Sequence, residues 1–346
     1  MIALQVDGFS YANFTKAEVI LSMDSLAGSF LFNAVDVESA GLPFKGGESC
    51  KITVNDELVI DGFIDIITVD YADSMHTITI EGRDKTSDII DSTIENVKIT
   101  GSATLKQVIE KVIENIGADI SVVDNVGLTP FNPAEDKLSA SIGQNAFDFI
   151  ETLARKKAVL LASNVGNVDI IKPSDSLLDI TLKNIIGAND NNIKSASYNK
   201  DLTTRFNRYK TRSQYNLVAL NEAGEFDTEQ VVNQSGEYID NEIRESRQFI
   251  LQSENASAAQ KARLRAEWEG VIRRTRSKTY GAVVIGHEND LGLWKPNTLI
   301  NVADDFAGLN ENMLINTVTF RIDVDSGTTT ELSLVDKEAY NVESAD

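Results

Sequence analysis

Glu81-Gly82-Arg83-Asp84-Lys85-Thr86-Ser87-Asp88-Ile89-Ile90-Asp91-Ser92-Thr93 marks the sharpest change of character in this chain. The residues before it, His76-Thr77-Ile78-Thr79-Ile80, alternate polar and apolar side chains and predict a strand. The residues after Asp84 predict the first helical segment. A weaker copy, Glu331-Leu332-Ser333-Leu334-Val335-Asp336-Lys337, stands near the other end of the chain. A strand that ends in Asp-Lys therefore occurs twice, and this repetition is the best clue to function.

Composition predicts a folded soluble protein of more than one domain. The chain has 346 residues, which is too long for one ordinary core, so we expect two or three domains. It has 53 acidic and 32 basic residues and a formal net charge of −21. Free binding to nucleic acid is disfavoured, because affinity for phosphates needs clustered cations.

The cysteine count, the N-terminus and the length of the apolar runs indicate in which cellular compartment the protein is expected. Cys50 is the only cysteine, so no disulfide forms within the chain, which fits a reducing compartment. The N-terminus lacks a basic segment followed by a long apolar core, so we predict no signal peptide. No apolar run approaches the roughly 18 residues of a membrane span, so we expect no membrane anchor.

The predicted fold class is α+β, mainly antiparallel β, with two β-barrel domains and an inserted small α/β domain. Residues 1–94 form the first barrel, because six or seven short strands follow one another, with a hairpin turn at Asn55-Asp56. In residues 57–69 we expect two strands, Glu57–Ile60 and Gly62–Val69.

Residues 95–188 predict the small α/β domain. One apolar face runs from Leu105 to Ile116, with Ser102 as the expected cap and Gly117 as the stop. A second helix is expected over residues 145–157, and a hairpin follows it.

Residues 189–346 predict the second barrel, with two additions. One is a long helix over about residues 256–276, capped by Asn255. The other is an acidic loop insertion, or a loose hairpin, over residues 221–239.

The two barrels look like copies of each other. Residues 51–85 and 299–337 each begin with a short strand, pass an acidic turn and continue into a long strand. Each then makes a tight turn into an alternating strand that ends in Asp-Lys. Any two antiparallel hairpins share part of this pattern, so chance similarity is the alternative to a structural duplication.

Several segments, in the same order, carry a family resemblance. They are Gly62-Phe63-Ile64-Asp65, Glu81–Ser92, Ala146–Ile171, Lys261–Glu269, Trp294–Leu299 and Asn312–Ile315. With them the chain resembles the baseplate hub proteins of contractile-tailed phages, the phage Mu type in particular, in a superfamily with T-even hubs and the first part of type VI secretion spikes. The resemblance implies a homotrimer with two tube-like barrels per subunit, placed between the tail tube and the central spike. Because little chain follows Tyr340, the spike is expected to be a separate protein.

We predict no catalytic, cofactor or metal site. His76 and His287 are the only histidines, and His287-Glu288-Asn289-Asp290 lacks the second histidine of a zinc-protease helix. Asp323-Val324-Asp325-Ser326-Gly327 is better explained as a hairpin turn than as a calcium loop, because the distal glutamate is missing.

Two groups of charged residues are candidate contact sites. Arg83, Asp84, Lys85 and Asp88, with Asp336 and Lys337 in the second copy, are expected to fix a domain corner or an interface rather than to form an active-site cluster. The expected long helix carries a basic face with Arg263, Arg265, Arg273 and Arg274. This face is expected to meet acidic surface of the same chain or of a neighbouring subunit; a DNA-facing helix is the alternative.

The residues alone indicate a multidomain, β-rich, acidic and non-enzymatic protein. The resemblance implies a structural hub of a baseplate, a trimeric adaptor between a six-fold tube and a three-fold spike, with a central channel. Its expected partners are the tail tube or a tube-initiator protein, a separate spike protein and surrounding baseplate proteins, with DNA only as passing cargo. The expected location is the virion tail, after assembly in the host cytoplasm. A phage-associated cell-wall or polysaccharide hydrolase remains the alternative, because 53 acidic residues leave room for a catalytic carboxylate pair.

Overall fold

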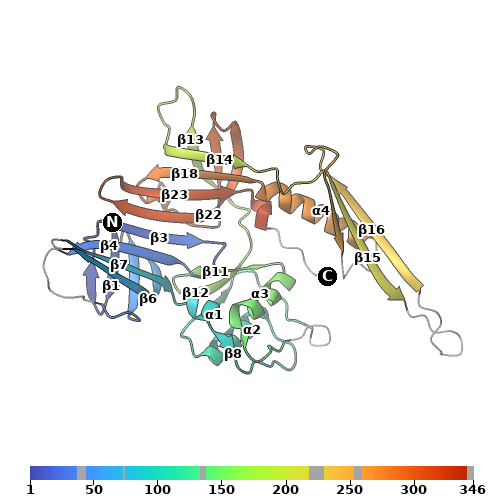
Figure 1. Cartoon of the computed structure of the whole chain (residues 1–346), viewed down its shortest axis with the longest axis horizontal. Coiled ribbons are helices and arrows are strands. Elements are labelled where there is room, and N and C mark those ends of the chain that lie inside the picture. The colour runs from blue at the N-terminus through green and yellow to red at the C-terminus, as the bar shows by residue number, and fades with distance from the viewer. Residues whose placement is uncertain (37–43, 73–74, 133–137, 218–229, 253–258, 341–346) are drawn as a thin grey trace. The chain divides into compact units, whose positions relative to one another are not determined.

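The computed structural model describes residues 1–36, 44–72, 75–132, 138–217, 230–252 and 259–340 (Figure 1). The chain divides into two compact units. Unit 1 contains residues 1–197, 280–334 and 344–346, and unit 2 contains residues 198–279 and 335–343. The described part is mainly antiparallel β, with four α-helices, so the coarse fold class is confirmed.

Unit 1 is built on one sheet of thirteen strands. Along the sheet the order is β14-β18-β23-β22-β3-β4-β7-β6-β5-β1-β2, and β21 joins β22 to β13 beside this path. The strands from the first part of the chain are β1 (Ile2–Val6), β2 (Phe9–Tyr11), β3 (Lys16–Ser22), β4 (Ser29–Asp36), β5 (Ser49–Val54), β6 (Glu57–Ala72) and β7 (Met75–Asp84). Those from the second part are β13 (Leu177–Asn184), β14 (Ile193–Lys200), β18 (Lys278–Ile285), β21 (Thr298–Asp304), β22 (Leu309–Asp323) and β23 (Gly327–Val335). A small hairpin, β19 (Glu288–Asn289) and β20 (Gly292–Leu293), precedes β21.

The sheet buries one face, as the alternation of its strands requires. Val19, Phe32, Phe320 and Leu332 lie on this face and are fully buried.

The predicted hairpin between β5 and β6 is confirmed. Asn55 and Asp56 both have positive φ, 49° and 65°, as a two-residue turn needs.

The prediction of two strands over residues 57–69 is wrong, because β6 is one strand of 16 residues. Its first part pairs with β5 and its later part with β7. Gly62 looks like a break in the sequence, but it marks a close approach of two strands. A Cβ on Gly62 would lie 2.0 Å from the carbonyl oxygen of Arg83.

Residues 87–171 contribute a small α/β region to unit 1. Its elements are α1 (Ser87–Asp91), β8 (Thr93–Ile94), α2 (Leu105–Ile116), β9 (Val122–Asp124), β10 (Gln144–Asn145), α3 (Ala146–Lys156), β11 (Leu160–Asn164) and β12 (Asn167–Ile171). The apolar face of α2 is confirmed, and its side chains join one buried cluster with those of α3. Gly117 ends α2 with φ 74°, as predicted. The expected cap Ser102 is wrong: Thr104 caps the helix, in a reciprocal pair with Gln107.

Unit 2 combines a three-stranded sheet with one long helix. Its elements are β15 (Arg208–Leu217), β16 (Gln230–Ile239), β17 (Gln248–Gln252), α4 (Ala259–Arg276) and the 3₁₀ turn η1 (Lys337–Tyr340). The helix lies directly on β16, since a Cβ on Gly236 would be 2.1 Å from the backbone nitrogen of Arg263. Residues 230–239 of the expected acidic loop form β16; residues 221–229 and the expected cap Asn255 lie outside the described residues.

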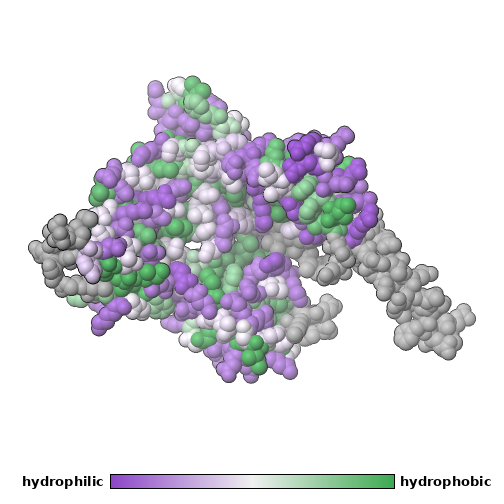
Figure 2. Space-filling model, in the orientation of Figure 1, coloured by the Kyte–Doolittle hydropathy of each residue, from purple (hydrophilic) through white to green (hydrophobic). Residues whose placement is uncertain are grey.

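Figure 2 shows hydrophilic residues over much of the face in view, with smaller hydrophobic patches between them. None of the helices in the described part combines the length and apolar character that a membrane crossing requires. The division at residues 94 and 188 stays a prediction.

Two equivalent corners as the candidate interface site

Asp84 ends β7 and is the most buried member of the predicted charged corner, with 1% of its surface exposed. Its Oδ2 accepts hydrogen bonds from the Gly28 backbone nitrogen at 2.8 Å and from Ser163 Oγ at 2.6 Å. Its Oδ1 accepts from the Thr86 backbone nitrogen at 3.0 Å and from the Thr86 hydroxyl. One carboxylate therefore ties together the β3–β4 turn, the start of α1 and the strand β11.

Burial has the largest effect on the pKa of Asp84. It raises the pKa of this carboxyl, while the hydrogen bonds from Ser163, Thr86 and Gly28 act in the opposite direction. A charged group in such a place is stable only while its donors stay in position. The hydrogen bonds to Asp84 therefore connect three segments of unit 1 at this corner, and its role as a domain corner or an interface stays a prediction.

Arg83 points to the other face of β7 and makes ion pairs there. Its Nε donates to Asp65 at 2.9 Å, and its two terminal nitrogens donate to Asp91 at 3.2 Å and 2.7 Å. The two-pronged bond from Arg83 holds the pKa of Asp91 below its usual value. Arg83 thereby links β6 to the end of α1.

Lys85 and Asp88 complete the first corner. Lys85 Nζ lies 2.9 Å from Asp61 Oδ2, and the Lys85 backbone nitrogen donates to the Asp61 carbonyl at 3.0 Å. Asp88 is exposed in the first turn of α1. Arg83, Asp84 and Lys85 thus make three separate sets of contacts, which together join β6, β7, α1 and β11.

Asp336 forms the same turn at the end of β23. Its Oδ1 accepts from the Glu338 backbone nitrogen at 3.0 Å, just as Asp84 Oδ1 accepts from that of Thr86. Lys337 then begins η1, as Lys85 precedes α1. Asp336 is only partly buried, so the two corners share a backbone shape but not an environment.

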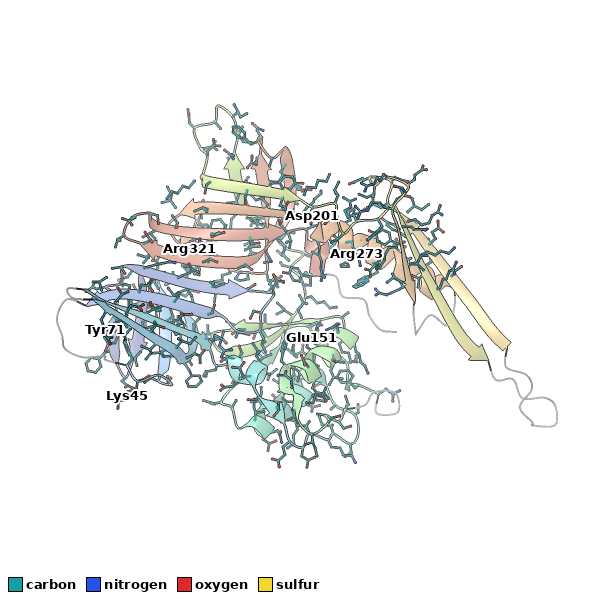
Figure 3. The ribbon with its side chains drawn as sticks, in the orientation of Figure 1. Lys45, Tyr71, Glu151, Asp201, Arg273 and Arg321 are labelled. Carbon is teal, nitrogen blue, oxygen red and sulfur yellow. The ribbon has the colours of Figure 1, made fainter. Side chains whose placement is uncertain are left out.

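The predicted basic face of α4 makes many contacts within unit 2. Arg273 Nε donates to Glu269 at 2.6 Å, and its guanidinium lies 4.1 Å from the ring centre of Phe249 (Figure 3). Arg265 stacks on Trp268 at 4.5 Å. Arg274 lies 3.9 Å from Glu338, while Arg263 is exposed. Three of the four arginines therefore pack against neighbours in their own unit.

Sequence reasoning missed two features of unit 1. His287 is buried, with Nδ1 3.2 Å from Thr330 Oγ1 and its ring edge-on to Phe320, and burial lowers the pKa of His287 to about 4. The alternation of β18 stops at Ile285, so no local pattern signals this burial.

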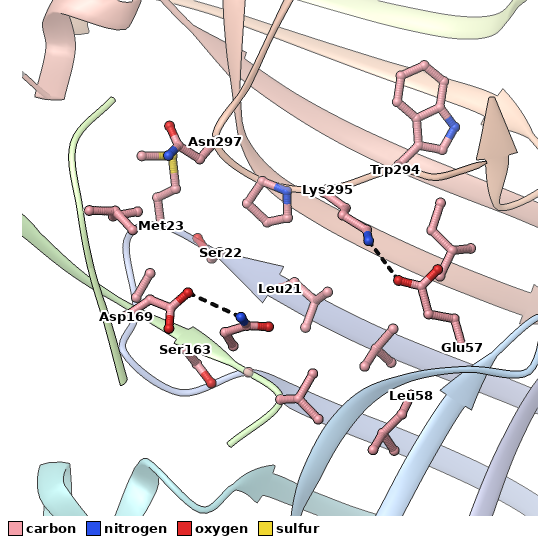
Figure 4. Close-up of a pocket in the computed structure, with 18 residues that line it drawn as sticks. Leu21, Ser22, Met23, Glu57, Leu58, Ser163, Asp169, Trp294, Lys295 and Asn297 are labelled. Carbon is pink, nitrogen blue, oxygen red and sulfur yellow. Dashed lines mark hydrogen bonds and ion pairs between the residues drawn. The ribbon is translucent and has the colours of Figure 1, made fainter. Parts of the chain in front are cut away.

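The second missed feature is a pocket of about 330 Å³ (Figure 4). Lys295 and Glu57 pair at its wall at 2.7 Å, and Asn164 Nδ2 donates to Asp169 at 3.1 Å. These residues come from four separate segments, so only the folded chain reveals the pocket. Among the described residues no group of three or more His, Cys, Asp or Glu side chains is arranged to hold a metal ion.

Two family models match the parts of the chain that contain Asp84 and Asp336. The family model for the N-terminal part of the Mu phage baseplate assembly protein GpP-like matches residues 1–84, and the model for the fourth domain of the same protein matches residues 258–343. The first match ends at Asp84, and the second includes Asp336 and Lys337. The baseplate hub protein gp44 of Escherichia phage Mu is 26% identical over 354 residues, covering 99% of this chain and 89% of that protein.

Solved structures agree in fold. The 43 kDa tail protein of prophage MuSo2 from Shewanella oneidensis has a TM-score of 0.81 at 26% identity, with 99% of both chains covered. A tail protein from Neisseria meningitidis has a TM-score of 0.78 at 18% identity, with 98% of both chains covered. A type VI secretion component from E. coli, c3393, has a TM-score of 0.56 at 11% identity, covering 99% of this chain and 80% of that one. Together, the two family models, the phage Mu relative and the fold of the prophage tail protein support a Mu-type baseplate hub.

Proposed function

We propose that the protein works as a structural, non-enzymatic homotrimer that joins a six-fold tail tube to a three-fold central spike. The observation that carries this proposal is a repeated strand order. The first half of the sheet runs β3-β4-β7-β6-β5-β1, and the second half runs β14-β18-β23-β22-β21-β13. Three chains would offer six similar half-sheets to the tube, as the adaptor role requires.

The two halves of the sheet also agree in the length of their central strands and in the hairpin that precedes each of them. The central strands β6 and β22 have 16 and 15 residues, and each follows a hairpin from a shorter strand, β5 or β21. The last strands end in the equivalent corners of Asp84 and Asp336. One difference lies at the outside, where β1 pairs antiparallel with β5 but β13 pairs parallel with β21. Two tube-like barrels per subunit are our interpretation of this repeat.

Within one chain the two halves are joined by β3 and β22. Seven residue pairs run antiparallel from Ser22–Thr317 to Lys16–Asp323. Arg321 crosses the joint, with its Nε 3.0 Å from Glu18 Oε2 and a terminal nitrogen on Glu331. This pairing supports a ring in which each half-sheet is hydrogen-bonded to the neighbouring half-sheet through its edge strand.

Charge supports a central channel that lets DNA pass without binding it. Residues 198–279 and 335–343 contain as many acidic as basic side chains, so the net charge of −21 belongs entirely to unit 1. The face of the sheet opposite the core carries acids such as Glu18, Glu81 and Glu331. Like charge repels DNA within a Debye length of about 8 Å at physiological salt.

The inserted small α/β domain would make the two ends of the proposed ring different from each other. Within residues 95–188, the elements from α2 to β12 have no counterpart in the second half of the sheet, so they would present three faces to a separate spike protein. The other partners in this proposal are the tube or a tube initiator and the surrounding baseplate proteins, in a virion tail assembled in the host cytoplasm.

A mass measurement tests the proposal. Native mass spectrometry of the purified protein is expected to give a species of three times 37.9 kDa. Electron microscopy of that species should show a ring with a hole. A peptidoglycan turnover assay is expected to give no product. A chain that stays monomeric at high concentration, or hydrolysis abolished by one Asp or Glu substitution, would refute the adaptor.

A further inference from the structure

The pocket of about 330 Å³ lies where three parts of unit 1 meet (Figure 4). Its wall is formed by the sheet strands β3 and β6, by the β11–β12 hairpin of the small α/β region and by the loop between β20 and β21. Small-ligand sites favour such meeting points and have a mainly apolar lining. The larger apolar residues of this lining are Leu21, Met23, Leu58, Val59, Ile171 and Leu293. The pocket therefore suits a ligand with an apolar body.

The charged residues of the lining leave one negative charge uncompensated. Glu57 and Lys295 pair with each other at 2.7 Å, and Asp169 is the remaining charged residue of the lining. Asp169 Oδ2 accepts a hydrogen bond from Asn164, while Oδ1 is buried and has no hydrogen-bond partner in the described part of the chain. A buried carboxylate oxygen without a donor costs free energy. A cationic donor is therefore the favoured partner of Asp169.

An ammonium group on an alkyl chain fits both the apolar lining and the carboxylate. The alkyl chain can lie along apolar side chains while the charged end stays at a polar group. Rotation about the Cβ–Cγ bond of an aspartate is soft, so a donor in the pocket can reach either oxygen of Asp169. The resulting hydrogen bond joins two opposite charges and is of the strong kind. A metal ion fits less well, because Glu57 is already paired and Asp169 alone offers too few ligands.

Trp294 indicates what carries the ammonium group. Its side chain is nearly buried, at 4% exposed, and its Nε1 has no hydrogen-bond partner in the described part of the chain. Figure 4 shows the indole and Asp169 on opposite sides of the pocket. An indole N–H can only donate, so it needs an acceptor. A lysine within a peptide supplies both groups, an ammonium and a backbone carbonyl, whereas a simple alkylamine supplies only the first.

We propose that this pocket binds a lysine side chain presented by a partner protein, with the ammonium on Asp169 and a backbone carbonyl of the partner on the indole of Trp294. Gly28 and Ser163 also line the pocket, and both donate hydrogen bonds to Asp84. The bound lysine would thus lie beside the buried corner. This site goes beyond the proposed adaptor role and does not depend on the number of subunits.

The fluorescence of Trp294 can report binding directly. The chain has two tryptophans, so in the full-length Trp268→Phe variant Trp294 is the only one. Titration with N-acetyl-lysine methylamide, at constant ionic strength, is expected to give a saturable change. N-acetyl-norleucine methylamide has the same four-carbon chain without the ammonium and should bind roughly tenfold more weakly or worse. n-Butylamine has the ammonium without a carbonyl and should also bind more weakly than the lysine compound.

Substitutions in the same Trp268→Phe background test the role of Asp169. Asp169→Asn keeps an acceptor for Asn164 and removes the charge, so it should weaken binding of the lysine compound roughly tenfold or more. Asp119→Asn is the matched control, because it removes one charge from an exposed position outside the lining, and it should bind like the parent. The reporter control is Trp294→Phe with Trp268 retained, which should show no change of fluorescence.

Each outcome supports or overturns the proposal. Equal binding of the lysine and norleucine compounds, or no saturable change, overturns it, and this comparison needs no substitution at Asp169. Butylamine that binds as tightly as the lysine compound overturns the assignment to a lysine of a partner protein. Native mass spectrometry of the same samples separates the pocket from the hub. A trimer that does not bind the lysine compound overturns the pocket and leaves the hub standing, and a monomer that binds it does the reverse.

Discussion

The meanders β5-β6-β7 and β21-β22-β23 share their strand order and differ in their surroundings. The first ends at Asp84, which is buried against β11, and the second ends at Asp336, which is partly exposed. The outer edge of β22 pairs with β3, whereas part of the same edge of β6 pairs with no strand in the described residues. The backbone pattern has thus been kept while the contacts around it changed. If these contacts, rather than the shared pattern, determine the stability of each half, equivalent substitutions in the two meanders should have different effects.

The largest effect is expected where the meanders differ in side-chain volume. When Asp84 is aligned with Asp336, Gly82 corresponds to the buried Leu334. A Cβ at Gly82 would lie 2.1 Å from the carbonyl oxygen of Phe63 and 2.4 Å from the ring of Phe30. Gly82→Leu should therefore lower the free energy of unfolding by more than about 3 kcal/mol, measured by urea denaturation. Gly281→Ala, which meets only a serine hydroxyl, is the control and should cost less than about 1 kcal/mol. Equal tolerance at both sites would mean that packing does not distinguish the meanders.

The two corners should respond differently to the same substitution. Asp84→Ala leaves the Gly28 nitrogen and the Ser163 hydroxyl without their acceptor, at an expected cost of about 3 kcal/mol. Asp336→Ala removes one partly exposed turn bond and should cost about 1 kcal/mol or less. Parallel urea titrations would measure both. Equal losses would show that the turn, and not its burial, stabilises each corner.

A smaller effect is expected from pH. His287 packs on Phe320 of the second meander, and its pKa falls from 6.5 to about 4 on folding. The unfolded chain then binds more protons between these values, so stability is full above pH 6.5 and falls as the pH drops toward 4. Between pH 7 and pH 5 this histidine should cost roughly 2 kcal/mol. His287→Phe should remove that part of the pH dependence, and an unchanged profile would contradict the burial of a neutral ring.

Much of the fold could be predicted from local patterns. The face of α2, the turn at Asn55-Asp56 and the repeated Asp-Lys ending all follow from spacing or turn chemistry that a few neighbouring residues determine. Gly62 misled the strand assignment, because the reason for a glycine there is the Arg83 carbonyl from a strand further along the chain. The cap at Thr104 could have been found from Gln107 three residues later.

The candidate site could be predicted only in part. Its charged residues were visible as a cluster, and Arg83, Asp84 and Lys85 each make contacts near the end of β7. The burial of Asp84 was not visible, because it depends on Ser163, 79 residues away. The burial of His287 depends in the same way on Thr330, 43 residues away.

The joint between β3 and β22 also constrains how the chain can be made. Glu18 and Arg321 are 303 residues apart in sequence, so β3 must wait for its partner until nearly the whole protein has been synthesised. At the usual rate of about 5–20 residues per second this delay is roughly 15–60 s. During that time the small α/β region, whose contacts are closer in sequence, can fold, while β3 stays an unprotected edge on the nascent chain. The contact that unites the two halves is therefore among the last to form, and a ribosome that stalls before residue 309 would release a protein with that edge still open.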